Sequence, residues 1–378
     1  MTLPPHRVQG LDNDEVAADW PPIGSAEIGW LQRHYPQLQG DPCLLWHSPR
    51  PLSAAAIIAT PAGKIFVKRH HRSVRSAAML VEEHRFIQHL AAAGVPVVQL
   101  LHDAAGNSAI EQGDWTYELH RVGEGRDPYR DVPSWTPPDS TRHALEAGRM
   151  LATLHRASAG YSAPPRSTHI LVAGDELIRA GDPIAALERQ LAQRPGLAGY
   201  LAGKPWQQDI ERAIMPFHRR LAGRLQQEPP LWAHNDWHVS NLLWRGEGNA
   251  MSVDTVLDFG LASPTSALFD LATAIERNAI AWLQLQHGAE AVRLDIVQAL
   301  VSGYRSVLAL APARMALLAD LLPVVHLDFA LSEVEYFHAI TGSPANADVA
   351  YHTFLLGHAE WFATPVGQAL LASLRDGG

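Results

Sequence analysis

The spacing of hydrophobic residues divides the chain into a strand-rich first part and a mostly helical second part. Between residues 43 and 122, short apolar runs are separated by turns that contain proline and glycine, which is typical of an antiparallel sheet. We therefore predict five strands in this part of the chain, at residues 43–47, 54–59, 65–69, 95–101 and 115–122.

One helix is predicted inside the strand-rich part, at residues 75–93. Its apolar side chains recur at the spacing that places them on one helical face: Leu80, Phe86, Ile87 and Leu90. A glycine follows directly and a proline comes two residues later, and both residue types end helices.

Beyond about residue 142 the pattern becomes mostly helical, after a segment rich in proline and glycine that marks a boundary. Helices are predicted at residues 144–158, 184–194, 206–226, 266–286, 291–308, 313–336 and 351–362. The fold class that follows is α+β with two lobes. Residues 1–40 form an N-terminal extension with a short helix, 41–122 a small antiparallel-sheet lobe with one helix (the N-lobe), and 123–378 a larger, mainly helical C-lobe.

Composition and charge exclude several classes of protein. The chain has 378 residues, 47% of them hydrophobic, and a net charge of −9, which argues against disorder and against a nucleic-acid partner. Its one cysteine cannot form an internal disulfide. The longest apolar region, 311–331, contains four charged or titratable residues, so we expect no membrane partner and a cytoplasmic location. Nothing in the pattern specifies an oligomeric state.

The candidate chemistry is concentrated in residues 231–260. His234, Asp236 and Asn241 follow the spacing H-x-D-x-x-x-x-N, and Asp258 stands seventeen positions after Asn241 in the tripeptide Asp-Phe-Gly. Phosphoryl transfer needs a carboxylate that accepts the proton of the attacking hydroxyl, and oxygen ligands that hold Mg²⁺ against the triphosphate. Asp236 can be that base, with Asn241 and Asp258 as metal ligands. The apolar runs between the last two predict a hairpin that brings them together.

The N-lobe contributes a second pair of residues. Lys68 ends an apolar strand, and Glu83 lies fifteen residues further on, in the predicted helix. A lysine that neutralises phosphates, braced by a helix glutamate, is the other half of a kinase site. Glu82 is adjacent, but Glu83 lies two turns before Leu90 on the same side of the helix and is preferred.

Six segments between about residues 45 and 275 resemble the aminoglycoside phosphotransferase and choline kinase family, the small-molecule branch of the protein-kinase-like fold. They are F-V-K (66–68), Glu83 with Leu90 and G-V-P (94–96), L-A-T-L-H (151–155), H-N-D-W-H-V-S-N (234–241), L-D-F-G (257–260) and F-D-L-A (269–272).

The resemblance implies ATP and Mg as cofactors and a small molecule with a hydroxyl group as acceptor. It implies Asp236 as catalytic base, Asn241 and Asp258 as metal ligands, and the pair of Lys68 and Glu83 as the phosphate anchor. Adenine is expected against the segment that contains Glu118, His120 and Val122, held by backbone groups. Asp270 is expected to brace the catalytic loop.

Three departures from the family pattern stand out. Asn235 occupies the position of a glycine, and residues 239–240 replace a Pro-Gly pair. The loop 48–53, which should cover the phosphates, contains no glycine, so Arg50 or Ser53 is a candidate for that contact and the choice between ATP and GTP stays open.

His234, Asp236 and His238 alternate and could bind zinc. A protein Ser/Thr kinase is disfavoured because only nine residues separate Gly260 from Asp270, and a nucleotide-binding pseudokinase has no positive support. The acceptor could be an aminoglycoside, an amino alcohol, a hydroxy amino acid or a sugar. Candidate residues for its pocket, or for an ordinary contact between helices, are Glu276, Arg277, Asn278, Asp328, Ser332, Glu335, Tyr336, His358, Glu360 and Trp361.

Overall fold

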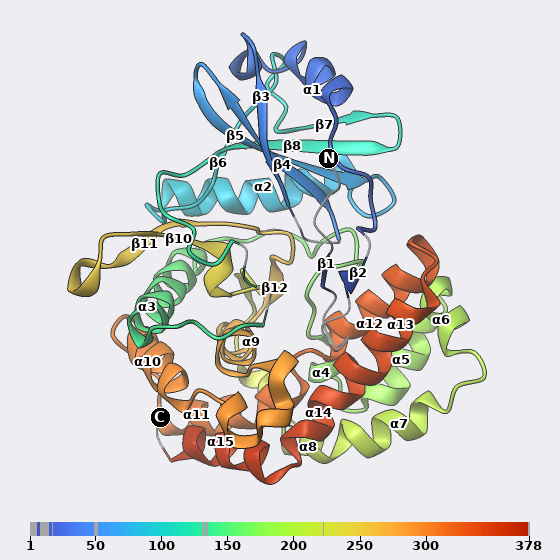
Figure 1. Cartoon of the computed structure of the whole chain (residues 1–378). Helices are drawn as coiled ribbons and strands as arrows, with labels where there is room; N and C mark the ends of the chain where they lie inside the picture. The colour runs from blue at the N-terminus through green and yellow to red at the C-terminus, as the bar shows by residue number, and fades with distance from the viewer. Residues whose placement is uncertain are drawn as a thin grey trace.

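The structure is a computed structural model that describes residues 6–7, 15–16, 18–48, 52–130, 132, 135–221 and 223–376. Two lobes lie one above the other in Figure 1, with the sheet in the upper lobe and most of the helices in the lower one. This arrangement confirms the predicted α+β fold of two lobes. The domain boundaries drawn from the sequence stay a prediction.

The N-lobe is built on one antiparallel sheet. Its strand order is β3-β4-β5-β8-β6, and β7 also pairs with β8. The strands are β3 (Cys43–His47), β4 (Ala54–Thr60), β5 (Gly63–His71), β6 (Gln99–Leu100), β7 (Ala109–Gln112) and β8 (Trp115–Arg121). The predicted strand at 95–101 shortens to the two residues of β6, and β7 was not predicted. In the register of β5 with β8, Lys68 lies opposite Glu118.

Two helices cover opposite faces of this sheet (Figure 1). Helix α1 (Ser25–Gln32) buries Ile28 and Leu31 in the same core as Ile58 and Leu119 of the sheet. Helix α2 (Ala77–Ala92) lies on the face toward the C-lobe and begins at Ser76, whose hydroxyl accepts from the Met79 N–H. The N-terminal extension therefore contributes a helix to the core of the N-lobe.

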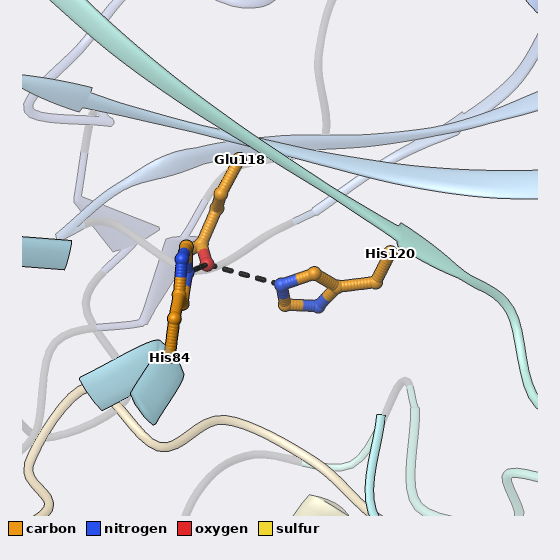
Figure 2. A group of neighbouring side chains, drawn as sticks. All are labelled: His84, Glu118 and His120. Carbon is orange, nitrogen blue, oxygen red and sulfur yellow. Dashed lines mark hydrogen bonds and ion pairs between the residues drawn. The ribbon is translucent and has the colours of Figure 1, made fainter. Parts of the chain in front are cut away.

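Polar side chains fill part of the space between α2 and β8. His84 rises from α2, and Glu118 and His120 project from β8, so that both rings point at one carboxylate (Figure 2). All three side chains are buried. They lie on the sheet face that looks toward the C-lobe.

The segment before α1 connects the two lobes. Trp20 stacks on His71 at the end of β5, with ring centroids 4.8 Å apart. Its indole N–H donates to the Tyr336 hydroxyl at 3.0 Å, and that hydroxyl donates to Asp19 at 2.9 Å. Residues of the extension thus contact both the sheet and a C-lobe helix.

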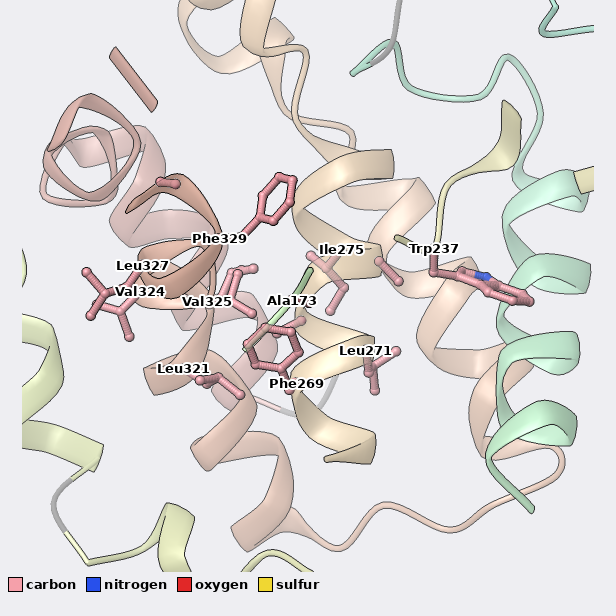
Figure 3. Close-up of a cluster of buried hydrophobic side chains, with 14 of the residues drawn as sticks. Ala173, Trp237, Phe269, Leu271, Ile275, Leu321, Val324, Val325, Leu327 and Phe329 are labelled. Atoms are coloured by element: carbon pink, nitrogen blue, oxygen red, sulfur yellow. The ribbon is translucent and has the colours of Figure 1, made fainter. Parts of the chain in front are cut away.

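Helix α9 (Ala267–Ala279) runs through the C-lobe core. Its side chains Phe269, Leu271 and Ile275 pack with apolar residues of the segment 321–329 (Figure 3). That segment belongs to the stretch Pro312–Ile340, which is long and apolar enough to cross a membrane by length and composition, but 89% of its most apolar window is buried inside this lobe. It is therefore the core of the C-lobe.

The other C-lobe helices are α3 (Thr141–Ser158), α4 (Glu176–Arg179), α5 (Pro183–Leu191), α6 (Pro195–Leu201), α7 (Trp206–Ala213), α8 (Met215–Leu221), α10 (Leu294–Arg305), α11 (Pro312–Leu321), α12 (Leu327–Glu335), α13 (Pro344–Asp348), α14 (His358–Phe362) and α15 (Pro365–Arg375). Two predicted helices are divided: 206–226 breaks near Pro216, and 313–336 passes through a 3-10 turn at Pro323. Proline lacks the N–H that continues an α-helix, which explains both breaks. Helices α4, α6, α13 and α15 were not predicted.

Four short strands frame the catalytic segment. Strand β9 (Leu231–Ala233) pairs with β12 (Ser263–Thr265), and β10 (Leu242–Arg245) pairs with β11 (Ser252–Val256). The β10–β11 pair confirms the hairpin predicted from the sequence. It places Leu242 opposite Val256, so that the residues just outside the hairpin, Asn241 and Leu257, are neighbours.

Helices α3 and α10 approach so closely that their contact requires glycine. A Cβ on Gly148 of α3 would lie 1.9 Å from the Leu300 carbonyl oxygen, and a Cβ on Gly303 of α10 would lie 1.9 Å from that of Leu145. Backbone atoms cannot yield as a flexible side chain can, so the two helices would have to separate.

We predict that Gly148→Ala lowers the free energy of unfolding by about 2 kcal/mol or more, because overpacking of a core contact typically costs about 1–3 kcal/mol. Denaturant unfolding measures this loss. The matched control is Gly29→Ala in α1, where a Cβ meets nothing within 4 Å and helix propensity should give a small gain. Equal stability of Gly148→Ala and wild type would contradict the close packing of α3 and α10.

Candidate active site

The loop that follows β9 is held by a single buried carboxylate. Asp270, in the first turn of α9, accepts the backbone N–H of His234 and that of Asn235, each at 2.9 Å. It also lies 3.0 Å from Nε2 of His155 at the end of α3. The bracing role that the resemblance implied for Asp270 is visible in these contacts.

Asn235 explains one departure from the family pattern. Its φ is +62°, in the left-handed region where glycine is favoured and asparagine is tolerated. Its side chain compensates for the missing glycine: the amide donates to Ser263 Oγ at 3.0 Å and its oxygen accepts from Thr265 Oγ1 at 2.7 Å. The loop therefore keeps its turn, and hydrogen bonds of the Asn235 side chain attach it to β12.

Asp236 is held between an amide and a guanidinium. Asn241 Nδ2 donates to Asp236 Oδ2 at 3.0 Å, and the Arg277 guanidinium lies 2.8 Å from Oδ1. Arg277 also stacks on Trp135, 4.3 Å from the ring centroid. Burial raises the pKa of Asp236, although the positive charge of Arg277 opposes that rise. Arg277 was considered for the acceptor pocket, but its pairing with Asp236 was not foreseen.

Asp258 faces the N-lobe. Its carboxylate lies 2.8 Å from the Lys68 ammonium, an ion pair that joins the lobes. Burial raises the pKa of Asp258, but Lys68 outweighs this effect and lowers that pKa to about 2. Two backbone contacts position the segment before it: Leu257 N donates to Asn241 O, and Leu257 O accepts from His234 Nε2, both at 2.8 Å.

The predicted brace between Lys68 and Glu83 is not formed. Glu83 is buried and pairs at 2.9 Å with Arg166, which also holds Glu82 at 3.1 Å. Arg166 comes from the loop after α3, far away in sequence. The guanidinium pairs with both carboxylates, while Lys68 pairs with Asp258 and is also subject to the nearby charges of Glu118 and Glu83. A direct role for Glu83 in nucleotide binding stays a prediction.

Glu118 takes part in a histidine cluster that sequence reasoning missed. Its carboxylate lies 2.9 Å from His84 Nε2 and 3.0 Å from both His70 Nε2 and His120 Nε2 (Figure 2 shows the first and last). Burial raises the pKa of Glu118, but these three rings lower it well below its usual value. Alternation on β5 and β8 places His70, Glu118 and His120 on the same face as Lys68, which is a signal that the sequence did contain.

One cavity, of about 170 Å³, brings most of the predicted residues together. Of the predicted site residues it is lined by Lys68, Glu83, Glu118, His120, Val122, Asn241 and Asp258. Asp236 lies behind Asn241, outside that lining. The Val122 N–H donates to the Lys64 carbonyl at 3.1 Å, so that amide is committed to the sheet. Arg50, a candidate for covering the phosphates, lies outside the described residues.

The donor atoms at the lobe boundary suit magnesium. Mg²⁺ prefers oxygen ligands, and Asp258 offers a carboxylate that is 43% exposed. Asn241 donates its Nδ2 hydrogens to Asp236, so its amide oxygen is the atom left for a metal. The roles of Asn241 and Asp258 as ligands stay predictions that this donor set supports.

The zinc interpretation does not fit. His234 uses Nε2 on the Leu257 carbonyl and Nδ1 on the Asp236 N–H, and His238 uses its ring nitrogens on Ser240 and on the Trp135 N–H. Both rings are therefore committed to the backbone geometry of the loop rather than directed at a shared point.

Several of the acceptor candidates hold helices together instead. Asp328 accepts the Leu177 N–H, Ser332 bonds the His169 carbonyl, and Glu335 pairs with His169 and Arg194. Tyr336 bonds the N-terminal extension. Among the candidates, Arg277 contacts Asp236 directly. The common helical face in the sequence was thus a packing face.

We predict that Asp270→Asn destabilises the chain by about 3–5 kcal/mol, because an amide cannot accept all the donors that converge on this buried carboxylate. The free energy of unfolding from denaturant titration tests this. Asp295→Asn is the control, since that acid is half-exposed and its pair with Arg293 is worth under about 1 kcal/mol. Similar losses in both variants would show that Asp270 does not hold the loop.

Comparison with known proteins places the fold. Among solved structures, the chain is similar to a microcompartment-associated aminopropanol kinase (17% identity, 92% of this chain and 100% of that one, TM-score 0.58). It is also similar to an amicoumacin kinase in complex with AMP-PNP and Ca²⁺ (13%, 86% and 89%, 0.55) and to a spectinomycin phosphotransferase in complex with ADP and spectinomycin (12%, 94% and 100%, 0.52). No curated protein matches the chain.

The family itself is shown by sequence. The profile described as "Phosphotransferase enzyme family" matches residues 54–310, about two thirds of the chain. This range contains β4 to β8, the catalytic loop, Asp258 and Asp270. The chain is therefore a member of the aminoglycoside phosphotransferase family of phosphotransferase enzymes.

Proposed function

We propose that the protein transfers the γ-phosphoryl group of ATP to a hydroxyl group of a small, amine-bearing molecule, with Asp236 as the base. One observation carries this proposal: Lys68, Asn241 and Asp258 come from three separate elements and line one cavity, with Asp236 hydrogen-bonded to Asn241 behind it.

The nucleotide would lie in this cavity. When bound, a magnesium ion held by Asn241 and Asp258 would neutralise negative charge on the phosphates. Lys68 would exchange its contact with Asp258 for the phosphates, since an ammonium and a metal ion compete for the same carboxylate. Apolar side chains from both lobes, among them Phe66 and Leu243, also line the cavity and suit contact with the adenine ring of the nucleotide. The structures of relatives with AMP-PNP and ADP support a nucleotide in this fold.

Asp236 would accept the proton of the acceptor hydroxyl as its oxygen attacks the γ-phosphorus and ADP leaves. Asn241 and Arg277 hold the two carboxylate oxygens, which fixes the orientation of the base. Arg277 also places a positive charge next to the site where the phosphoryl group would be transferred.

Acidic side chains near Glu333, in the same region as Arg277 and Asp236, support an amine-bearing acceptor. Burial raises the pKa of Glu333 to about 7, and the charges that act on it include those of Arg277, Asp236, Asp19 and Glu276. The acidic groups that act on Glu333 outnumber the one arginine, and a cationic group bound nearby would stabilise the ionised form of Glu333. This favours an aminoglycoside, an amino alcohol or a hydroxy amino acid over a neutral sugar.

A protein kinase finds no support in the structure. The nine residues between Gly260 and Asp270 form β12, which pairs with β9, and then enter α9. They are therefore part of the C-lobe framework and do not present a loop for a peptide. A pseudokinase would have no need for a base held in this manner beside the metal ligands.

We predict that Asp236→Asn lowers kcat by about 10²–10⁴, since a general base contributes about that much, while the affinity for nucleotide is unchanged. A coupled assay of ADP release over amino alcohols, aminoglycosides and hydroxy amino acids first identifies an acceptor and then measures the variant. Asp295→Asn should turn over like wild type. Full activity of Asp236→Asn would refute the assignment of the base.

We further predict that Asp258→Asn removes the effect of Mg²⁺ on nucleotide binding. Calorimetry of AMP-PNP binding, with Mg²⁺ and with EDTA, should show metal-enhanced affinity for wild type and equal affinities for the variant. An enhancement by Mg²⁺ that survives the substitution would place the metal on other residues.

A further inference from the structure

A second group of titratable side chains lies in the C-lobe, outside the cavity. Glu276 of α9, His326 just before α12, and His358 at the start of α14 bring their ligand atoms within 4.8 Å of one another. Their exposed fractions are 2%, 3% and 4%. Three helical segments that are distant in sequence therefore meet at one buried point, and none of these three side chains has a catalytic role in the proposed mechanism.

The protonation of His326 is fixed by its neighbour. Its Nε2 lies 3.0 Å from the Leu355 carbonyl oxygen, which can only accept, so Nε2 carries the hydrogen. In the neutral ring the other nitrogen, Nδ1, then carries a lone pair. This buried Nδ1 has no hydrogen-bond partner.

The lone pair of His326 faces another acceptor. Glu276 Oε1 lies 3.5 Å from His326 Nδ1 and 3.3 Å from His358 Nδ1. A hydrogen on His358 Nδ1 could be donated to Glu276 Oε1. His326 Nδ1 carries no hydrogen that it could donate to the same oxygen. Two electron-rich atoms this close in a buried place require either a proton or a metal cation between them.

The spacing distinguishes this group from the histidine cluster of the N-lobe. Around Glu118 the nitrogen–oxygen distances are 2.9–3.0 Å, the length of an N–H···O hydrogen bond, so protons alone account for them. The distances of 3.3 and 3.5 Å around Glu276 are longer. Ligands about 2.0–2.2 Å from a tetrahedral zinc ion stand about 3.3 Å apart, close to the two distances from Glu276 Oε1 to the histidine nitrogens.

Contacts on the outer side of the rings hold them in place. Trp282 stacks on His358 with ring centroids 3.5 Å apart and planes 5° from parallel, and its indole N–H donates to the Glu276 carbonyl at 3.1 Å. The Leu355 carbonyl orients His326. Such outer contacts fix ring orientation in metal sites.

We propose that Glu276, His326 and His358 bind a transition-metal dication of the zinc type, with both histidines ligating through Nδ1. Two imidazoles and one carboxylate are a common ligand set for zinc and leave a fourth position for a water molecule. The ion would tie α14 and the start of α12 to the end of α9, where Arg277 follows Glu276 and contacts Asp236. This site is separate from the oxygen ligands proposed for magnesium.

The test is the metal content of the untagged full-length chain, grown with zinc and dialysed against a mild chelator without nucleotide. We expect one zinc per wild-type chain by mass spectrometry of the metal, and no zinc in His326→Asn or His358→Asn. Two matched controls should keep it: His352→Asn, an exposed histidine near His358, and His84→Asn, which disrupts the N-lobe cluster. A chain purified with cobalt should show the strong visible bands of a tetrahedral nitrogen-ligated site.

The Glu276→Gln variant distinguishes a metal site from a site that needs only a proton. It stays informative if the histidine variants fail to fold. Its amide can donate a hydrogen to His326 Nδ1, so a site that needs only a proton would stay as stable as wild type. The proposal predicts instead that Glu276→Gln loses zinc and melts at the lower temperature of metal-stripped wild type. Zinc-free wild type, or zinc that persists in His326→Asn, would overturn the proposal and leave the proposed phosphotransfer untouched.

Discussion

The active site depends on the carboxylate of Asp270, which accepts two consecutive backbone N–H groups of the catalytic loop. These two hydrogen bonds hold the chain in a turn that includes a residue with positive φ, and the residues that form them are buried. Because the next residue is Asp236, the direction of this proposed base follows from the position of α9. The same helix carries Arg277 on its last turn, so one element sets both the loop and the charge that faces it.

The second determinant is the distribution of charge between the lobes. Lys68 and Asp258 neutralise each other across the boundary, while Arg166 holds Glu82 and Glu83. Arg75 adds a link: its guanidinium donates to the carbonyl oxygens of Ile170, Leu171 and Gly260, and burial lowers its pKa to about 10. Helix α2 is thereby attached to the C-lobe, next to the tripeptide that contains Asp258. In the proposed binding mode the nucleotide rearranges the pair of Lys68 and Asp258, whereas these buried arginines keep their contacts.

The sequence predicted those parts of the site that are local. The spacing from His234 to Asn241 fits within one loop, and the hairpin that joins Asn241 to Asp258 is visible as two apolar runs. Ion-pair partners that come from distant segments of the chain could not be predicted in this way. Arg166, which pairs with Glu83, lies in a loop without regular structure. No periodicity of hydrophobic residues therefore connects these two positions in the sequence. The same is true of Arg277 and Asp236, whose contact depends on where α9 packs.

Alternation and helical spacing showed which face a residue occupies but not what that face contacts. Asp328, Ser332 and Glu335 share a helical face as expected, and this face contacts the segment 169–177 and Arg194. Glu118 and three histidines likewise share a space because two strands and a helix converge there. In both cases the local pattern was correct, and the missing information was the packing of distant elements.

The most direct test of the account is a crystal structure of the chain with Mg²⁺ and AMP-PNP. We expect the triphosphate between Lys68 and Asp258, with a metal ion bound to oxygen atoms of Asn241 and Asp258 and the γ-phosphate directed toward Asp236. A nucleotide bound outside this cavity, or one bound with Lys68 still paired to Asp258 and no metal on Asn241, would contradict the central claim.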